Sequence, residues 1–264
     1  MPTFAVLGST GNTGTCLVRN LLDHSPHNHV NAYCRNKAKL FNLIPEVVDN
    51  KRVTVFEGSV NDAELMDRLL RDTKAVFLAV TTNDNIPGTR LNTDTTMAVI
   101  RSIYRLRDAS GPGYTPPKVI LLSASAPDDH LSRNMSKLFR PIILRAASAV
   151  YLDVCRAEDV LRSHDHWIDS VYMKPAGLSM DIARGYELTL DDQESFLSYN
   201  DLANAMIEVA ADDDEGRWVG KSVGILNKVA GQGAKFPTGT PMTIATGFIR
   251  HFAPWLHPYL PSSG

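Results

Sequence analysis

The N-terminal stretch of the chain constrains the fold more than any other feature. Residues 3–7 form a short apolar run whose length and following glycine are typical of a buried parallel strand. A turn with glycines at positions 8, 11 and 14 follows, and apolar residues then recur at helical spacing at positions 17, 18, 21 and 22. Strand, glycine turn and helix in this order predict the first half of a dinucleotide-binding βαβ unit.

Each glycine of the turn has its own expected role. Gly8 permits a tight turn, Gly11 lets the backbone approach a pyrophosphate, and Gly14 allows close packing of helix on strand. Free amides at the helix start would then face an anion. The predicted cofactor contacts in this turn are Gly8, Thr10, Gly11, Asn12, Thr13 and Gly14. The glycine spacing differs from the Gly-x-Gly-x-x-Gly dehydrogenase fingerprint, and an ordinary tight turn is the alternative.

The end of the second strand, expected over residues 30–35, indicates which cofactor is preferred. An NAD-preferring protein usually carries Asp or Glu there for the adenine ribose hydroxyls. This chain has Arg35 and Asn36, with Lys37 and Lys39 just beyond. A guanidinium pairs with a 2′-phosphate, so the pattern favours NADP(H) over NAD. The alternative is a basic helix start on a solvated surface.

Strands and helices alternate through most of the chain. Further strands are expected at 52–58, 75–80, 118–125 and 167–173, and helices at 63–70, 91–106 and 143–162. This alternation predicts an α/β fold with a doubly wound parallel sheet. Ligands bind outside the carboxyl ends of such strands, which adds Ser59, Val60, Thr81 and Asn83 to the predicted cofactor contacts.

The pattern changes beyond residue 178. A short strand at 187–190 and a helix at 199–211 are expected there. We predict one domain over residues 1–264, to which residues 179–264 contribute a small substrate-covering cap and a tail. The tail, residues 241–260, mixes apolar residues with prolines and is expected to be a lid or packing helix. Its alternative is a hydrophobic contact to a partner subunit or a membrane face.

Composition limits the class of protein. The formal net charge of −2 argues against a general binder of nucleic acid or anionic membranes. Three scattered cysteines, Cys16, Cys34 and Cys155, suggest reduced thiols, and no metal site is expected. The early first strand leaves no room for a signal peptide, and no apolar run approaches the roughly 20 residues that span a bilayer. These features predict a cytoplasmic protein.

Several motifs together resemble a known family. The glycine turn, the pair Ser125 and Tyr151, and the turn at 174–178 resemble atypical short-chain dehydrogenase/reductases of the NmrA-like kind, whose late helix start is similar to residues 198–203. Residues 32–36, 122–127 and 251–260 more narrowly resemble the fungal averufin oxidase A family. The resemblance implies a Rossmann-like fold, a nicotinamide cofactor and an aromatic polyketide substrate of secondary metabolism. Within the 174–178 turn, Pro175 and Gly177 are the expected cofactor contacts.

The resemblance does not settle the reaction. Short-chain reductases place a lysine four residues after the catalytic tyrosine, where its charge lowers the tyrosine pKa. In this chain Cys155 stands four residues after Tyr151, and a thiol supplies no such charge. Lys174 is the only nearby lysine that we consider as a substitute.

The catalytic candidates are Tyr151, Ser125, Ser123, His130 and Lys174, with Asp128 as a further loop residue. Each also has a plain structural interpretation: a half-buried helix tyrosine, strand-end hydroxyls that satisfy local amides, or a surface histidine. The main hypothesis is an NADP-dependent oxidoreductase. The alternatives are a redox-neutral isomerase or cyclase on the same scaffold, and a non-catalytic NADP-binding redox sensor. A homodimer is left open.

Overall fold

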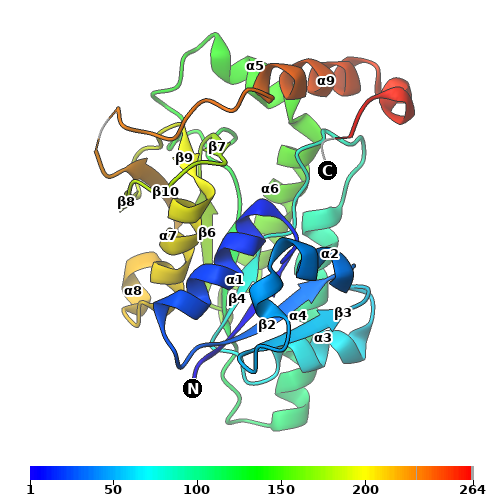
Figure 1. Ribbon diagram of the computed structural model, residues 1–264, viewed down its shortest axis with the longest axis vertical. Coiled ribbons are helices and arrows are strands. Elements are labelled where there is room, and N and C mark those ends of the chain that lie inside the picture. The colour runs from blue at the N-terminus through cyan, green and yellow to red at the C-terminus, as the bar shows by residue number, and fades with distance from the viewer. Residues whose placement is uncertain (230, 263–264) are drawn as a thin grey trace.

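The computed structural model describes residues 1–229 and 231–262 and is built around an eight-stranded sheet (Figure 1). In spatial order the strands are β3 (Val53–Glu57), β2 (His29–Cys34), β1 (Thr3–Leu7), β4 (Ala75–Leu78), β5 (Lys118–Leu122), β6 (Ser170–Lys174), β10 (Ser222–Asn227) and β8 (Tyr186–Thr189). All neighbouring strands pair in parallel except β8, which runs antiparallel to β10. The prediction of a doubly wound α/β fold is confirmed.

Helices cover both faces of the sheet and divide the core in two. On one face lie α1 (Asn12–His24), α2 (Lys37–Leu43) and α7 (Tyr199–Ala211), and on the other lie α3 (Ala63–Leu70), α4 (Leu91–Ser110) and α6 (Ser148–Arg162). The predicted apolar stripe of α1 is buried, with Leu17, Val18 and Leu21 fully excluded from water and α7 packed against the helix. Burying one such side chain contributes about 1.5–3 kcal/mol, so this stripe fixes α1 and the glycine turn before it.

The prediction of one continuous helix over residues 143–162 is wrong. The chain instead forms α5 (Phe139–Ala146) and α6, with a break at Ala147. The side chain of Asn85, which is buried, enters this break: its Nδ2 donates to the Arg145 carbonyl at 3.4 Å and its Oδ1 accepts from the Ala149 amide at 2.7 Å. A polar side chain that pairs with backbone groups at this point interrupts the helical ladder.

Residues 179–264 are divided between the sheet and a separate tail. The short strand predicted at 187–190 is β8, which runs antiparallel to β10, while β10 was not predicted and links β8 to β6. This part of the expected cap is therefore a continuation of the sheet. The remaining small elements are η1 (Pro45–Val47), β7 (Leu178–Ser179), β9 (Leu197–Ser198), α8 (Glu215–Trp218), α9 (Thr240–Phe252) and η2 (Pro254–Tyr259). Helix α9 packs on α5 at the end of the molecule opposite to the N-terminus (Figure 1). That the tail covers a substrate remains a prediction.

Candidate functional site

The glycine turn after β1 has the geometry that the sequence predicts. Gly8 has a φ of +91°, in the left-handed region, and an added Cβ would lie 2.5 Å from the Ala79 carbonyl oxygen. A Cβ on Gly14 would lie 2.0 Å from the Gly8 carbonyl oxygen, so this close approach of helix to turn also requires glycine. A Cβ on Gly11 would meet no atom of the described residues closer than the Gly8 carbonyl oxygen at 3.4 Å. The space beside Gly11 is therefore open to a ligand.

The start of α1 offers backbone donors to that space. Gly11 is the N-cap residue, and no side chain in the described part of the chain caps the helix. The amides of Asn12, Thr13 and Gly14 therefore stand at a positive helix end without a capping side chain. Thr10 is half-buried beside them and Thr13 is buried. A pyrophosphate fits this arrangement, because it needs converging N–H donors and close backbone approach.

Arg35 follows β2 directly and is exposed. The first turn of α2 beyond it is already capped: Asn36 Oδ1 accepts from the Lys39 amide at 2.8 Å, and Glu57 Oε1 accepts from the Lys37 amide at 2.9 Å. None of the ion pairs among the described residues involves Arg35. Its guanidinium is thus available to a phosphate at the end of β2.

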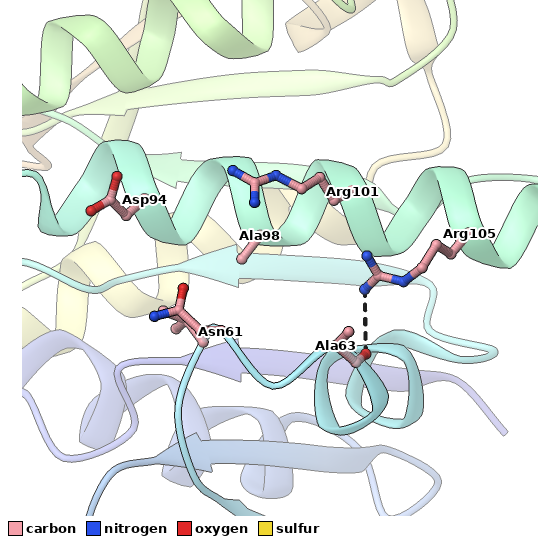
Figure 2. Close-up of a pocket in the computed structure, with 7 residues that line it drawn as sticks. Asn61, Ala63, Asp94, Ala98, Arg101 and Arg105 are labelled. Carbon is pink, nitrogen blue, oxygen red and sulfur yellow. Dashed lines mark hydrogen bonds between the residues drawn. The ribbon is translucent and has the colours of Figure 1, made fainter.

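The cofactor contacts predicted at strand ends lie at the carboxyl ends of β3 and β4. Ser59, Thr81 and Asn83 are exposed, whereas Val60 is half-buried and lines a surface cavity of about 290 Å³ between α3 and α4. Figure 2 shows the other lining residues, with Arg105 bonded to the Ala63 carbonyl. This cavity is polar, and none of the catalytic candidates lines it.

A buried ionic cluster brings two of the catalytic candidates together. The Lys174 ammonium, at the end of β6, lies 3.0 Å from Asp128 Oδ2 and 2.9 Å from Glu158 Oε2. The Ser123 hydroxyl, just beyond β5, donates to the other oxygen of Glu158. All four side chains are buried or nearly so. One ammonium is thus held between two carboxylates at the carboxyl edge of the sheet, and the Ser123 hydroxyl donates to one of them.

Asp128 is held in its charged form within this cluster. Burial alone would raise the pKa of its carboxyl. The Leu131 amide and the Lys174 ammonium outweigh that effect, so the pKa of Asp128 is lowered. Removing the Lys174 ammonium would leave the Asp128 carboxylate buried without its ionic partner, which is strongly destabilising.

Tyr151 lies apart from this charge. It is half-buried on α6, and desolvation raises its pKa to about 12. Cys155, one turn later, feels the cluster instead: burial raises the pKa of its thiol first, Glu158 raises it further, and Lys174 lowers it. Lys174 therefore does not activate Tyr151 in the way that the reductase lysine does.

The other predicted residues have more local partners. Ser125 is buried, and its amide donates to the Pro175 carbonyl at 3.0 Å, which joins the end of β5 to the 174–178 turn. An added Cβ on Gly177 would lie 2.5 Å from the Phe196 ring, so packing explains this glycine. His130 is exposed on a loop and pairs with Asp191 Oδ1 at 3.2 Å. The structure does not bring His130 into the buried cluster.

Glu158 was missed by reasoning from the sequence. It stands seven residues after Tyr151 and three after Cys155, so all three share one face of α6. That spacing was the available signal. No group of three or more His, Cys, Asp or Glu side chains in the described chain is arranged to hold a metal ion. None of the helices described is long and apolar enough to cross a membrane.

Comparison with known proteins agrees with this geometry. The model of a family described as NAD(P)H-binding matches residues 8–213. A protein of Pestalotiopsis microspora named as an oxidoreductase is 54% identical across 100% of this chain and 99% of its own length. A second protein named as an oxidoreductase, from Paecilomyces divaricatus, is 48% identical across 100% of this chain and 99% of its own length.

Solved structures show the same fold at low identity. A short-chain dehydrogenase/reductase of Veillonella parvula in complex with NADP superimposes with a TM-score of 0.65 at 18% identity, covering 90% of this chain and 99% of that one. The family match spans the glycine turn, the β2 end and the buried cluster. The chain therefore belongs to the NAD(P)H-binding family, with a Rossmann-like α/β fold.

Proposed function

We propose that this protein is an NADP(H)-dependent oxidoreductase that modifies an aromatic polyketide in fungal secondary metabolism. The observation that carries the proposal is the uncapped start of α1 beside the open space at Gly11, with the Arg35 guanidinium available at the end of β2. The oxidoreductase names of the fungal relatives support redox chemistry. The polyketide class rests on the resemblance to the averufin oxidase A family.

The bound nicotinamide would supply or accept a hydride, and the chain would handle the accompanying proton. We assign that proton to the buried cluster. The Ser123 hydroxyl donates to Glu158, and Glu158 pairs with Lys174, so a proton can move among these groups without crossing bulk water. Asp128 holds the Lys174 ammonium in place from its other side. Tyr151 is a weaker candidate for this step, because desolvation raises the pKa of its phenol to about 12 and so makes the phenol a poorer proton donor.

A redox-neutral isomerase or cyclase is the second candidate, and one observation favours it. Cys155 stands where short-chain reductases carry the cation that activates the tyrosine, and no charged group in the described part of the chain offsets the desolvation of Tyr151. On this alternative the cofactor would hold the site in shape while the cluster performs acid–base chemistry. Because both candidate functions use the same residues, they are distinguished only by whether the cofactor is oxidised or reduced during turnover.

Purified protein mixed with NADPH and a panel of polycyclic aromatic polyketides tests the proposal. We expect NADPH absorbance to fall in proportion to the product formed. When NADP and the reduced form of the polyketide are supplied instead, we expect NADPH absorbance to rise. Product formed without any change in NADPH would support the redox-neutral candidate. Tight NADPH binding with no turnover across the panel would favour a redox sensor.

A further inference from the structure

The outer surface of the C-terminal tail is apolar although the tail is firmly packed. Helix α9 contacts α5 through Gly247, where an added Cβ would lie 2.1 Å from the Ala146 carbonyl oxygen. Arg250, on the same inner side, is buried and pairs with Asp84 Oδ1 at 3.1 Å. The Ser148 hydroxyl lies 2.7 Å from His251 Nδ1. Contacts to α5, to α6 and to the loop after β4 therefore fix which side of α9 faces outward.

The outward side of α9 carries an apolar stripe. Met242, Ile249 and Phe252 share one face of the helix by their spacing, and all three are exposed. The exposed apolar surface continues into η2, where Trp255 is 71% and Tyr259 is 84% exposed. We call this surface the tail face and define it by Leu138, Phe139, Ile142, Met242, Ile249, Phe252, Trp255, Leu256 and Tyr259. Exposed apolar residues gathered on helices that pack against one another mark interaction sites.

The charges of the segments that carry the tail face indicate what kind of partner it binds. Residues 130–152, which include α5, carry Arg133, Lys137, Arg140 and Arg145 and no Asp or Glu. Residues 233–262, which include α9 and η2, also contain no Asp or Glu. Arg140 pairs with Asp129 and the buried Arg250 with Asp84, whereas the exposed Lys137 and Arg145 form no ion pair among the described residues and leave free positive charge beside the tail face. A second copy of the chain docked through this face would bring like charges together, whereas an anionic surface would be attracted.

We propose that the tail face binds the surface of a lipid bilayer that contains anionic lipids. The exposed Trp255 and Tyr259 are the residue types that settle at the headgroup level, and the apolar stripe of α9 would enter the boundary with the acyl chains. Exposed Lys137 and Arg145 stand on the neighbouring α5 segment, where anionic headgroups can neutralise them. Binding of this kind is peripheral and needs no spanning helix. It goes beyond the proposed oxidoreductase activity and does not depend on it.

Tryptophan fluorescence provides a direct readout. The chain has three tryptophans, of which Trp218 is buried and Trp167 is half-buried against Tyr104, so Trp255 is the one that a membrane would newly cover. We expect phosphatidylcholine vesicles containing phosphatidylserine to shift the emission to shorter wavelength and to sediment the protein. Vesicles of phosphatidylcholine alone should bind more weakly, and added salt should reduce binding to the anionic vesicles.

Paired variants separate apolar from charge contributions. Phe252→Ser should weaken vesicle binding about tenfold, since it removes a side chain that would be buried in the lipid. Lys137→Glu makes the net charge more negative by two units. Each unit changes affinity for an anionic surface about fivefold, so binding to phosphatidylserine vesicles should weaken about 25-fold. Val48→Ser and Lys51→Glu are the controls, because both residues are exposed and precede the amino end of β3, away from the tail face. Both controls should bind vesicles as the unaltered protein does.

Two results would overturn the proposal. One is the absence of sedimentation and spectral shift with phosphatidylserine vesicles at low ionic strength. The other is vesicle binding that Phe252→Ser and Lys137→Glu leave unchanged. A dimer that Trp255→Ser dissociates, without any vesicle binding, would assign the tail face to a second copy instead. An unchanged thermal transition and unchanged NADPH affinity in each variant would show that the fold and the cofactor site are intact.

Discussion

The Lys174 ammonium lies 2.9 Å from Glu158 Oε2, and Glu158 stands on the same face of α6 as Tyr151 and Cys155. The cation of this site thus comes from the end of β6 and pairs with a carboxylate of α6, instead of standing one turn after the tyrosine. For this reason we propose the cluster of Ser123, Glu158 and Lys174, and not Tyr151, as the group that transfers the proton.

Arg35→Asp should weaken NADPH binding by a factor of about 10 to 150, because it removes a charge-assisted pair worth about 1.5–3 kcal/mol. Binding of NADH should change much less, since it carries no 2′-phosphate. Calorimetric titration with both cofactors measures the difference, and Lys51→Asp, at an exposed position before the amino end of β3, is the control. Equal affinity of the unaltered protein for NADPH and NADH would contradict the role given to Arg35.

Gly11→Val and Gly14→Ala should fail for different reasons. The atom nearest to a Cβ at position 11, among the residues that the structure describes, is the Gly8 carbonyl oxygen at 3.4 Å, so Gly11→Val should fold and lose cofactor binding by occupying pyrophosphate space. At position 14 the Cβ would lie 2.0 Å from the Gly8 carbonyl oxygen, so Gly14→Ala should destabilise the fold by about 1–3 kcal/mol. Thermal unfolding and NADPH titration of both variants distinguish the two effects. A folded Gly11→Val variant with unchanged NADPH affinity would show that the turn has only a structural role.

These glycine positions could be predicted from the sequence because their constraint is local: one strand, one turn and one helix meet within residues 3–22. Lys174 was a candidate only because it stands at the end of a predicted strand, and the sequence did not indicate which two carboxylates pair with it. Asp128 and Glu158 reach Lys174 across 46 and 16 residues of chain, and contacts at such separations depend on the register of β5 and β6. The break between α5 and α6 was unpredictable for the same reason, since Asn85 comes from the loop after β4.

Glu158→Gln should lower turnover by about 10²–10⁴-fold while the Michaelis constant changes little, because it removes a proton acceptor and keeps the size of the side chain. Tyr151→Phe is the matched variant on the same helix face and should lose less activity. Its companion, Cys155→Lys, should bring little gain, because a lysine there would pair with Glu158. Initial rates with NADPH and a polyketide substrate test this order, with thermal unfolding as the check on folding. If Tyr151→Phe were inactive and Glu158→Gln fully active, the proton-transfer role would belong to Tyr151.

The stability of the protein should depend on Asp128 at acidic pH. Its folded-state pKa is lowered, so its charged form stabilises the fold above the ordinary Asp pKa of about 4, and that stability is lost as pH falls through the lowered value. Asp128→Asn should therefore unfold more easily than the unaltered protein at neutral pH, and the difference should shrink on acidification. Urea unfolding as a function of pH measures this. A difference that is constant over the acidic range would mean that Asp128 has no ionic role.

The most direct measurement of the central claim follows a hydride. NADPH that carries deuterium at the reactive carbon of its nicotinamide ring is incubated with the protein and a polyketide that it converts, and the product is analysed by mass spectrometry. Our account predicts that turnover transfers deuterium between the cofactor and the polyketide, and that Gly11→Val abolishes the transfer. Complete turnover with all deuterium retained in the cofactor, for both faces of the labelled ring, would contradict it.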